Sequence, residues 1–129
     1  MIVLDASAAL EVFLQTPLGL RRAGEVLGQE KHAPPLLDIE FVQALRRLTL
    51  GGEIQPLQAR LLLDIFRDMR IVRHPHLPLL GRIWELRRSL SAYDAAYVAL
   101  AEALEAPLLT CDAKLAHSHG HGAEVILLS

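Results

Sequence analysis

Short aliphatic runs alternate with longer segments of helical apolar spacing along the whole chain. The runs at 2–4, 71–74, 107–110 and 124–128 have the composition of buried β-strands. Helices are expected at 6–14, from Pro17 to about Glu30, and at 36–50, 55–69, 79–90, 92–104 and 113–117. Helix 92–104 is apolar on nearly all sides and is expected to be largely buried. This alternation predicts a three-layer α/β/α sandwich around a small parallel sheet.

Length and composition predict one small globular domain. A chain of 129 residues with 52% hydrophobic residues forms a single domain over 1–129 and is not largely disordered. The only cysteine, Cys111, excludes an internal disulfide and a cysteine-rich zinc site. Because Asp5 interrupts the first apolar run and no basic leader precedes it, we expect no membrane segment and a cytoplasmic location.

Charge is distributed unevenly. The net charge of −2 argues against a general nucleic-acid binder, which carries a basic excess. Residues 41–90, however, hold nine arginines against four acids. Arginine suits phosphate because its planar guanidinium forms paired hydrogen bonds. A solvated helix face explains the same run equally well.

Two aspartates follow predicted strands. Asp5 comes directly after run 2–4, and Asp112 lies two positions after Thr110. Ligands of open parallel sheets bind at the carboxyl ends of the strands, so both acids are expected at one rim. Each also precedes a helix, where helix capping alone would explain it.

Two further acids lie on predicted helices. Asp94 follows Ser91 with the spacing of a capping box, yet it enters a helix apolar enough to bury it. Glu40 lies inside helix 36–50 at the edge of the apolar stripe, where a salt bridge to Arg47 is the alternative explanation.

Four carboxylates in one crevice would repel one another unless a divalent cation compensated them. Oxygen ligands select a hard ion, Mg²⁺ or Mn²⁺, whose usual substrate contact is phosphate. Such an ion lowers the pKa of bound water and stabilises charge on phosphorus oxygens. Phosphodiester hydrolysis is the reaction this arrangement predicts.

Four segments carry a family resemblance: IVLDASA at 2–8, EFVQALRR at 40–47, SAYDAAYVALA at 91–101 and LLTCDAKLA at 108–116. In this order and spacing they resemble the PIN domain, and more narrowly the VapC-type toxins of bacterial toxin–antitoxin pairs. The resemblance implies a Mg²⁺- or Mn²⁺-dependent endoribonuclease whose acids match Asp5, Glu40, Asp94 and Asp112. It also implies hydrogen-bonding roles for Ser7 and Thr110, a homodimer, and inhibition by a VapB-type antitoxin.

The chain departs from the family pattern at two positions. Gln43 stands where many relatives have Asn three residues after the glutamate, which would shift that polar contact. Lys114 stands where some relatives carry a further acid, which weakens the case for a second metal ion.

Several alternatives compete with this interpretation. The alternating histidines His117, His119 and His121 suggest zinc, but glycines and the absence of a nearby Cys or acid disfavour a closed site. Cys111 has no adjoining histidine to activate it. An aspartyl-phosphate chemistry at Asp5 would favour a second Asp where Ser7 stands.

The alternative from another functional class is a non-catalytic PIN-like module that binds RNA or protein. Four acids disfavour it, since negative charge repels phosphate. If RNA is the substrate, Arg46, Arg47, Arg87 and Arg88 are the expected contacts, and binding should weaken with salt. Apolar sides of segments 55–69 and 18–30 are candidate dimer or antitoxin surfaces.

Overall fold

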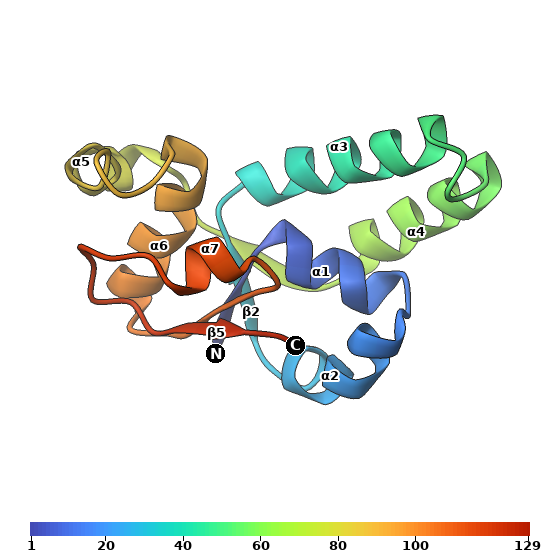
Figure 1. Ribbon diagram of the computed structural model, residues 1–129, viewed down its shortest axis with the longest axis horizontal. Helices are drawn as coiled ribbons and strands as arrows, with labels where there is room; N and C mark the ends of the chain where they lie inside the picture. The colour runs from blue at the N-terminus through green and yellow to red at the C-terminus, as the bar shows by residue number, and fades with distance from the viewer.

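Five parallel strands form the centre of the computed structural model, which describes all 129 residues. Their order is β3-β2-β1-β4-β5, and every neighbouring pair is parallel (Figure 1). The strands are β1 (Ile2–Leu4), β2 (Lys31–Ala33), β3 (Ile71–Arg73), β4 (Leu108–Thr110) and β5 (Val125–Leu127).

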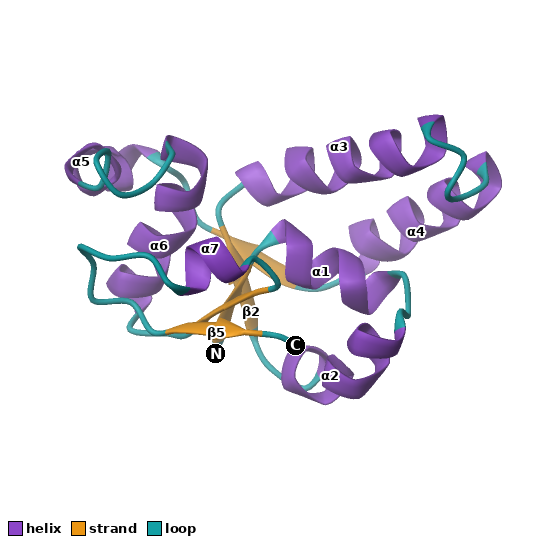
Figure 2. Cartoon of the chain, in the orientation of Figure 1, coloured by secondary structure: helices purple, strands orange, loops and turns teal.

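Helices lie on both sides of these strands, which confirms the three-layer α/β/α sandwich (Figure 2). The helices are α1 (Ala6–Phe13), α2 (Pro17–Leu27), α3 (Leu36–Leu50), α4 (Pro56–Asp68), α5 (Leu80–Glu85), α6 (Ala92–Leu104) and α7 (Ala113–Ala116), with a 3₁₀ turn at Leu77–Leu79. None of them is both long and apolar enough to cross a membrane.

The core is aliphatic, with one aromatic cluster. Helix α6 has seven consecutive buried residues from Ala95 to Ala101, as its apolar sequence predicts. Phe41 stacks on Phe66 with ring centroids 4.1 Å apart, and Phe13 meets both edge-on. This packing fixes α1, α3 and α4 relative to one another, so side chains on α1 and α3 face each other across a defined gap.

The sequence does not predict strand β2, because the preceding helix is expected to extend to about Glu30. The helix ends at Leu27. The polar residues Lys31 and His32 then belong to β2 and pair with both β1 and β3. Their burial is compensated locally. Lys31 Nζ donates to two carbonyl oxygens, and the His32 ring hydrogen-bonds Glu30 and His74.

The helix predicted over 79–90 is also shorter than expected. It consists of the 3₁₀ turn and α5, which ends at Glu85. The remainder turns back because Leu86 is buried in the core and Ser91 starts α6 as its N-cap.

The strand order places a topological switch point between β1 and β4. The chain proceeds from β1 outward through β2 to β3, then returns to the other side of β1 for β4 and β5. Connections leaving neighbouring strands β1 and β4 therefore diverge, which opens a crevice at their carboxyl ends. Asp5 and Asp112 follow these two strands.

Candidate active site

Asp5 is anchored at the end of β1 by contacts to both of its carboxylate oxygens. Ser7 Oγ and the Ala8 backbone N–H donate to Oδ1 at 2.7 and 2.9 Å, and Thr110 Oγ1 donates to Oδ2 at 2.5 Å. Ser7 Oγ in turn accepts from the Cys111 backbone N–H. Asp5 thus caps α1 and also links the end of β1 to the end of β4. Its role as a helix cap therefore does not exclude a role in the candidate site.

The carboxylate of Asp5 is buried, with 7% of the residue exposed. Burial raises its pKa above the ordinary 3.8, the hydrogen bonds from Thr110, Ala8 and Ser7 oppose that rise, and the charge of Asp94 adds to it. No lysine or arginine pairs with it.

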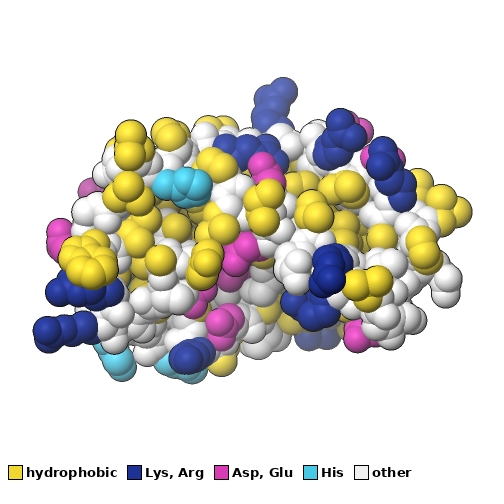
Figure 3. All heavy atoms as spheres, turned by 90° about the horizontal axis from the view of Figure 1, so that it is seen from above, with side chains coloured by type: hydrophobic (Ala, Val, Ile, Leu, Met, Phe, Trp, Pro, Cys, Tyr) yellow, Lys and Arg dark blue, Asp and Glu magenta, His cyan; other side chains and the backbone are white.

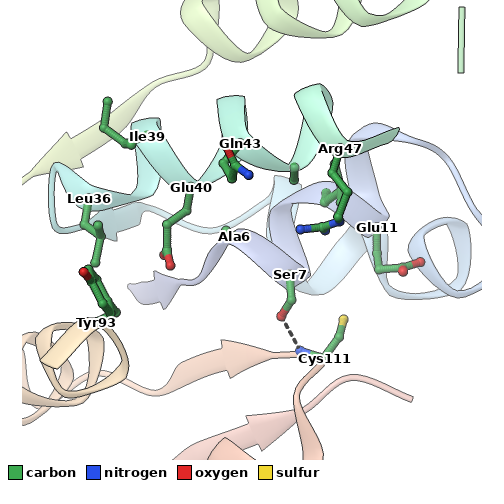
Figure 4. A pocket seen from close by; sticks show the side chains of 12 residues that line it. Ala6, Ser7, Glu11, Leu36, Ile39, Glu40, Gln43, Arg47, Tyr93 and Cys111 are labelled. Atoms are coloured by element: carbon green, nitrogen blue, oxygen red, sulfur yellow. Dashed lines mark hydrogen bonds between the residues drawn. The ribbon is translucent and has the colours of Figure 1, made fainter. Parts of the chain in front are cut away.

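Glu40 points from α3 into the space above α1 (Figure 4). Its Oε1 accepts a 2.6 Å hydrogen bond from the phenol of Tyr97 on α6. Desolvation raises the pKa of Glu40, the Tyr97 bond opposes this, and Asp5 and Asp94 raise it further. The alternative salt bridge to Arg47 does not form.

Asp94 and Asp112 complete the group. The Asp94 backbone N–H donates to Ser91 Oγ, which caps α6, while its half-buried side chain has a pKa raised by desolvation and by Asp112. Nearby Lys114 opposes that rise. Asp112 is exposed and its Oδ1 caps α7 by accepting from the Lys114 backbone N–H.

Mutual repulsion therefore connects the four acids in a series: Glu40 with Asp5 and Asp94, Asp5 with Asp94, and Asp94 with Asp112. Figure 3 shows acidic side chains in the middle of this face and basic ones around them. The donor set consists of carboxylates only, with Lys114 as the one cation that opposes their raised pKa values, and it fits a hard divalent cation. The side chains do not form a closed cage, because no three His, Cys, Asp or Glu are arranged as metal ligands.

An elongated groove of about 540 Å³ extends from this acidic edge between α1 and α3. Leu36, Ile39 and Tyr93 line it near Glu40, and Arg47 lies at the far end near Glu11 (Figure 4). Seven of its twelve lining residues are hydrophobic, and the other five are Ser7, Glu11, Glu40, Gln43 and Arg47. The groove has the size and chemistry of a small-ligand site.

The remaining sequence-predicted residues are dispersed. Gln43 lies one turn after Glu40 and lines the same groove, while Ser7 and Thr110 both hydrogen-bond Asp5. The predicted arginine contacts separate into four places: Arg47 in the groove, Arg46 in a different groove between α3 and α4, Arg87 stacked on Trp84, and Arg88 in a cavity beside Asp94.

Sequence analysis missed Tyr97 as the partner of Glu40, and Tyr93 as a wall of the groove. A usable signal exists for Tyr97, because it lies three residues after Asp94 and therefore on the same side of α6. Burial raises the pKa of the Cys111 thiol to about 11, with Asp5 and Glu11 adding to the rise, which disfavours a thiolate nucleophile.

Known proteins of one family resemble this chain in sequence and in fold. The model of the PIN domain family matches residues 2–119. The chain belongs to the PIN domain family. Among its relatives, ribonuclease VapC12 of Mycobacterium tuberculosis is 42% identical over 129 residues, which covers 100% of both chains. Ribonuclease VapC1 of the same organism is 47% identical over 98 residues, covering 75% of this chain and 74% of the relative.

A solved structure supports the PIN fold. VapBC2 from Rickettsia felis, bound to a DNA fragment from its promoter, has a TM-score of 0.67 to this chain at 18% identity. The match covers 97% of this chain and 98% of that one. At this identity the likeness concerns the fold alone.

Proposed function

We propose that this PIN-domain protein is the endoribonuclease toxin of a VapBC-type toxin–antitoxin pair. It hydrolyses RNA phosphodiester bonds at an acidic site formed by Asp5, Glu40, Asp94 and Asp112. The observation that carries the proposal is that four carboxylates lie at one sheet edge, where neighbouring acids raise the pKa values of Asp5, Glu40 and Asp94 and no ion pair neutralises them. Full-length similarity to a ribonuclease supports the choice of substrate.

Asp5, Asp94 and Asp112 would hold Mg²⁺ or Mn²⁺. Such an ion lowers the pKa of a bound water and offsets charge on the phosphoryl oxygens. The exposed Asp112 and half-buried Asp94 have room to rotate toward an ion, while Asp5 is held in place by Ser7 and Thr110. Asp5 Oδ2 accepts only from Thr110 and retains a lone pair for ligation, whereas both lone pairs of Oδ1 are used by Ser7 and Ala8.

Glu40 is suited to accept the proton of the attacking water. Its raised pKa brings the carboxylate closer to neutral pH, where a general base acts most effectively. The Tyr97 hydroxyl fixes Oε1 and leaves Oε2 available for the water proton. The water oxygen then bonds to phosphorus as one phosphorus–oxygen ester bond breaks.

The proposed partners follow from exposed apolar residues on the neighbouring helices. Ile39 on α3 and Leu57, Leu61 and Ile65 on α4 are all more than half exposed. We assign these faces to a VapB-type antitoxin or to a second copy in a homodimer. A cytoplasmic location suits both an RNA substrate and an antitoxin partner.

Incubation of the purified protein with total cellular RNA, with and without Mn²⁺, tests the function. We expect new 5′ ends at defined positions only when the metal is present, and none when chelator is added. RNA that is bound but never cut in any divalent metal would instead support the non-catalytic binding module.

A further inference from the structure

A second cavity of about 460 Å³ adjoins the acidic edge at Asp94. The segment 88–91 before α6, helix α7 and the turn after it form the walls of this cavity. Its size falls within the range of ligand sites, and it shares no lining residue with the apolar groove. Adjacent residues of α6 divide the two spaces, because Tyr93 lines the groove and Asp94 lines the cavity.

The lining of this cavity carries two cationic side chains and two imidazoles. Arg88, Lys114, His117 and His119 surround it, together with the hydroxyls of three serines, Ser89, Ser91 and Ser118. Asp94 is the only carboxylate in the lining. A lysine and an arginine facing one carboxylate disfavour a second metal ion there and favour an anion.

These nitrogen donors are available to a ligand. No salt bridge and no side-chain hydrogen bond involves Arg88, Lys114, His117 or His119. Arg73 and Arg82, in contrast, are both engaged by carboxylates elsewhere in the fold. Arginine, lysine and histidine donors converging on one space form the chemistry that binds phosphate oxygens.

We propose that this cavity binds the phosphodiester next to the one that is cut, and so sets the position of the RNA strand across the acidic edge. The proposal rests on the proposed ribonuclease function. We identify the anion as RNA because Asp94 belongs both to the acidic site and to this cavity. A strand whose scissile phosphate reaches Asp94 has its neighbouring phosphate within the reach of Lys114 or Arg88. An acidic protein segment is the competing occupant.

Binding of a fluorescent single-stranded RNA in EDTA, measured across a salt series, tests the subsite without cleavage. Each of Lys114→Gln and Arg88→Gln should weaken binding about five- to tenfold at low salt and lower the salt slope by about 0.7. Lys114→Arg should keep both the affinity and the salt slope of the wild type. Arg67→Gln, an exposed arginine of α4 without an ion pair, is the matched control and should leave binding nearly unchanged.

A phosphate titration followed by NMR separates this proposal from the parent function. Inorganic phosphate should shift the ring resonances of His117 and His119 in the wild type and not in the double variant Arg88→Gln/Lys114→Gln. Normal metal-dependent RNA cleavage with unchanged salt slopes in both single variants would overturn the subsite and leave the ribonuclease intact. Loss of poly-glutamate binding in these variants, with RNA binding unchanged, would assign the cavity to a protein and overturn it as well. Absence of cleavage alongside phosphate-dependent histidine shifts would reject the ribonuclease instead.

Discussion

Two carboxylates at opposite ends of helix α6 have their pKa values shifted in opposite directions. Near its end, Glu102 accepts from Arg82 Nε at 2.8 Å, from Arg82 Nη2 at 2.9 Å, and from the Gly122 backbone N–H. Arg82 lowers the pKa of Glu102 first by hydrogen bonding and then by its charge. At the start of the helix, burial and the charge of Asp112 raise the pKa of Asp94, and Lys114 opposes that rise without forming an ion pair with it.

The difference shows that counter-charge, more than burial, separates structural from functional acids in this fold. Both side chains are only partly buried. The Arg82–Glu102 pair ties α5 and the 120–122 loop to α6, so its charge is neutralised within the protein. The acidic edge keeps an unneutralised charge, which an external cation can offset.

Paired substitutions at these two positions should give the largest contrast. Asp94→Asn removes a proposed metal ligand worth several kcal/mol in the transition state, so RNA cleavage should fall about 10³-fold. Glu102→Gln should leave the rate of cleavage within a few-fold of wild type. Initial rates on one defined RNA, measured in Mn²⁺, test both variants.

Stability provides the control for this pair. Urea unfolding should show Glu102→Gln destabilised by about 1–2 kcal/mol, because a charged hydrogen-bonding partner of Arg82 is lost. Asp94→Asn should unfold at the same urea concentration as the wild type, or higher. Full cleavage by Asp94→Asn would contradict its assignment to the site.

Metal binding should produce the next largest effect, and only at the acidic edge. An ion that binds the folded state alone stabilises it by about 2.7 kcal/mol at a concentration 100 times its Kd. Mn²⁺ should therefore raise the Tm of the wild type and of Glu102→Gln by similar amounts. Asp94→Asn and Asp5→Asn should show little increase. Equal increases in all four proteins would place the metal elsewhere.

The layers of the fold and the candidate acids can be predicted from the sequence, whereas the Arg82–Glu102 pair is not among its predictions. Alternating apolar runs give the three layers, and the positions of Asp5 and Asp112 directly after strands place them at a common edge. Asp94 stands out because it enters a helix with few polar residues. These predictions succeed because strand and helix periodicity are local properties of the chain.

The remaining features depend on contacts between distant segments. Strand β2 is not predicted because Lys31 and His32 are polar, and the strands and the His74 ring that pair with them are distant in the sequence. Glu40 forms no pair with Arg47 and instead accepts from Tyr97, 57 positions away, which only the folded chain brings to α3. The second cavity likewise joins Arg88 to the turn after α7.

The smallest expected effect is a difference in pH dependence in EDTA. Asp5 and Glu40 have raised pKa values in the folded protein, so the folded state binds more protons than the unfolded state just above the ordinary values of 3.8 and 4.5. Stability from these groups is full at lower pH and is lost as pH rises through the raised values. Glu102 has a lowered pKa, so its contribution is present above 4.5 and is lost as pH falls through the lowered value.

Urea unfolding from about pH 3 to 8 separates the two contributions, at about 1.4 kcal/mol for each unit of difference between folded and unfolded pKa. Asp5→Asn should flatten the decline of stability above pH 4, because an amide does not titrate. Its oxygen can still accept from Ser7 and Ala8, while its NH2 group cannot accept from Thr110, so only the pH dependence and not the absolute stability is compared. Glu102→Gln should remove the rise of stability near and below pH 4.5 and leave the decline at higher pH. A steeper decline in Asp5→Asn would mean that Asp5 is stabilised in its charged form, and the acidic edge would then resemble the Arg82 cluster rather than differ from it.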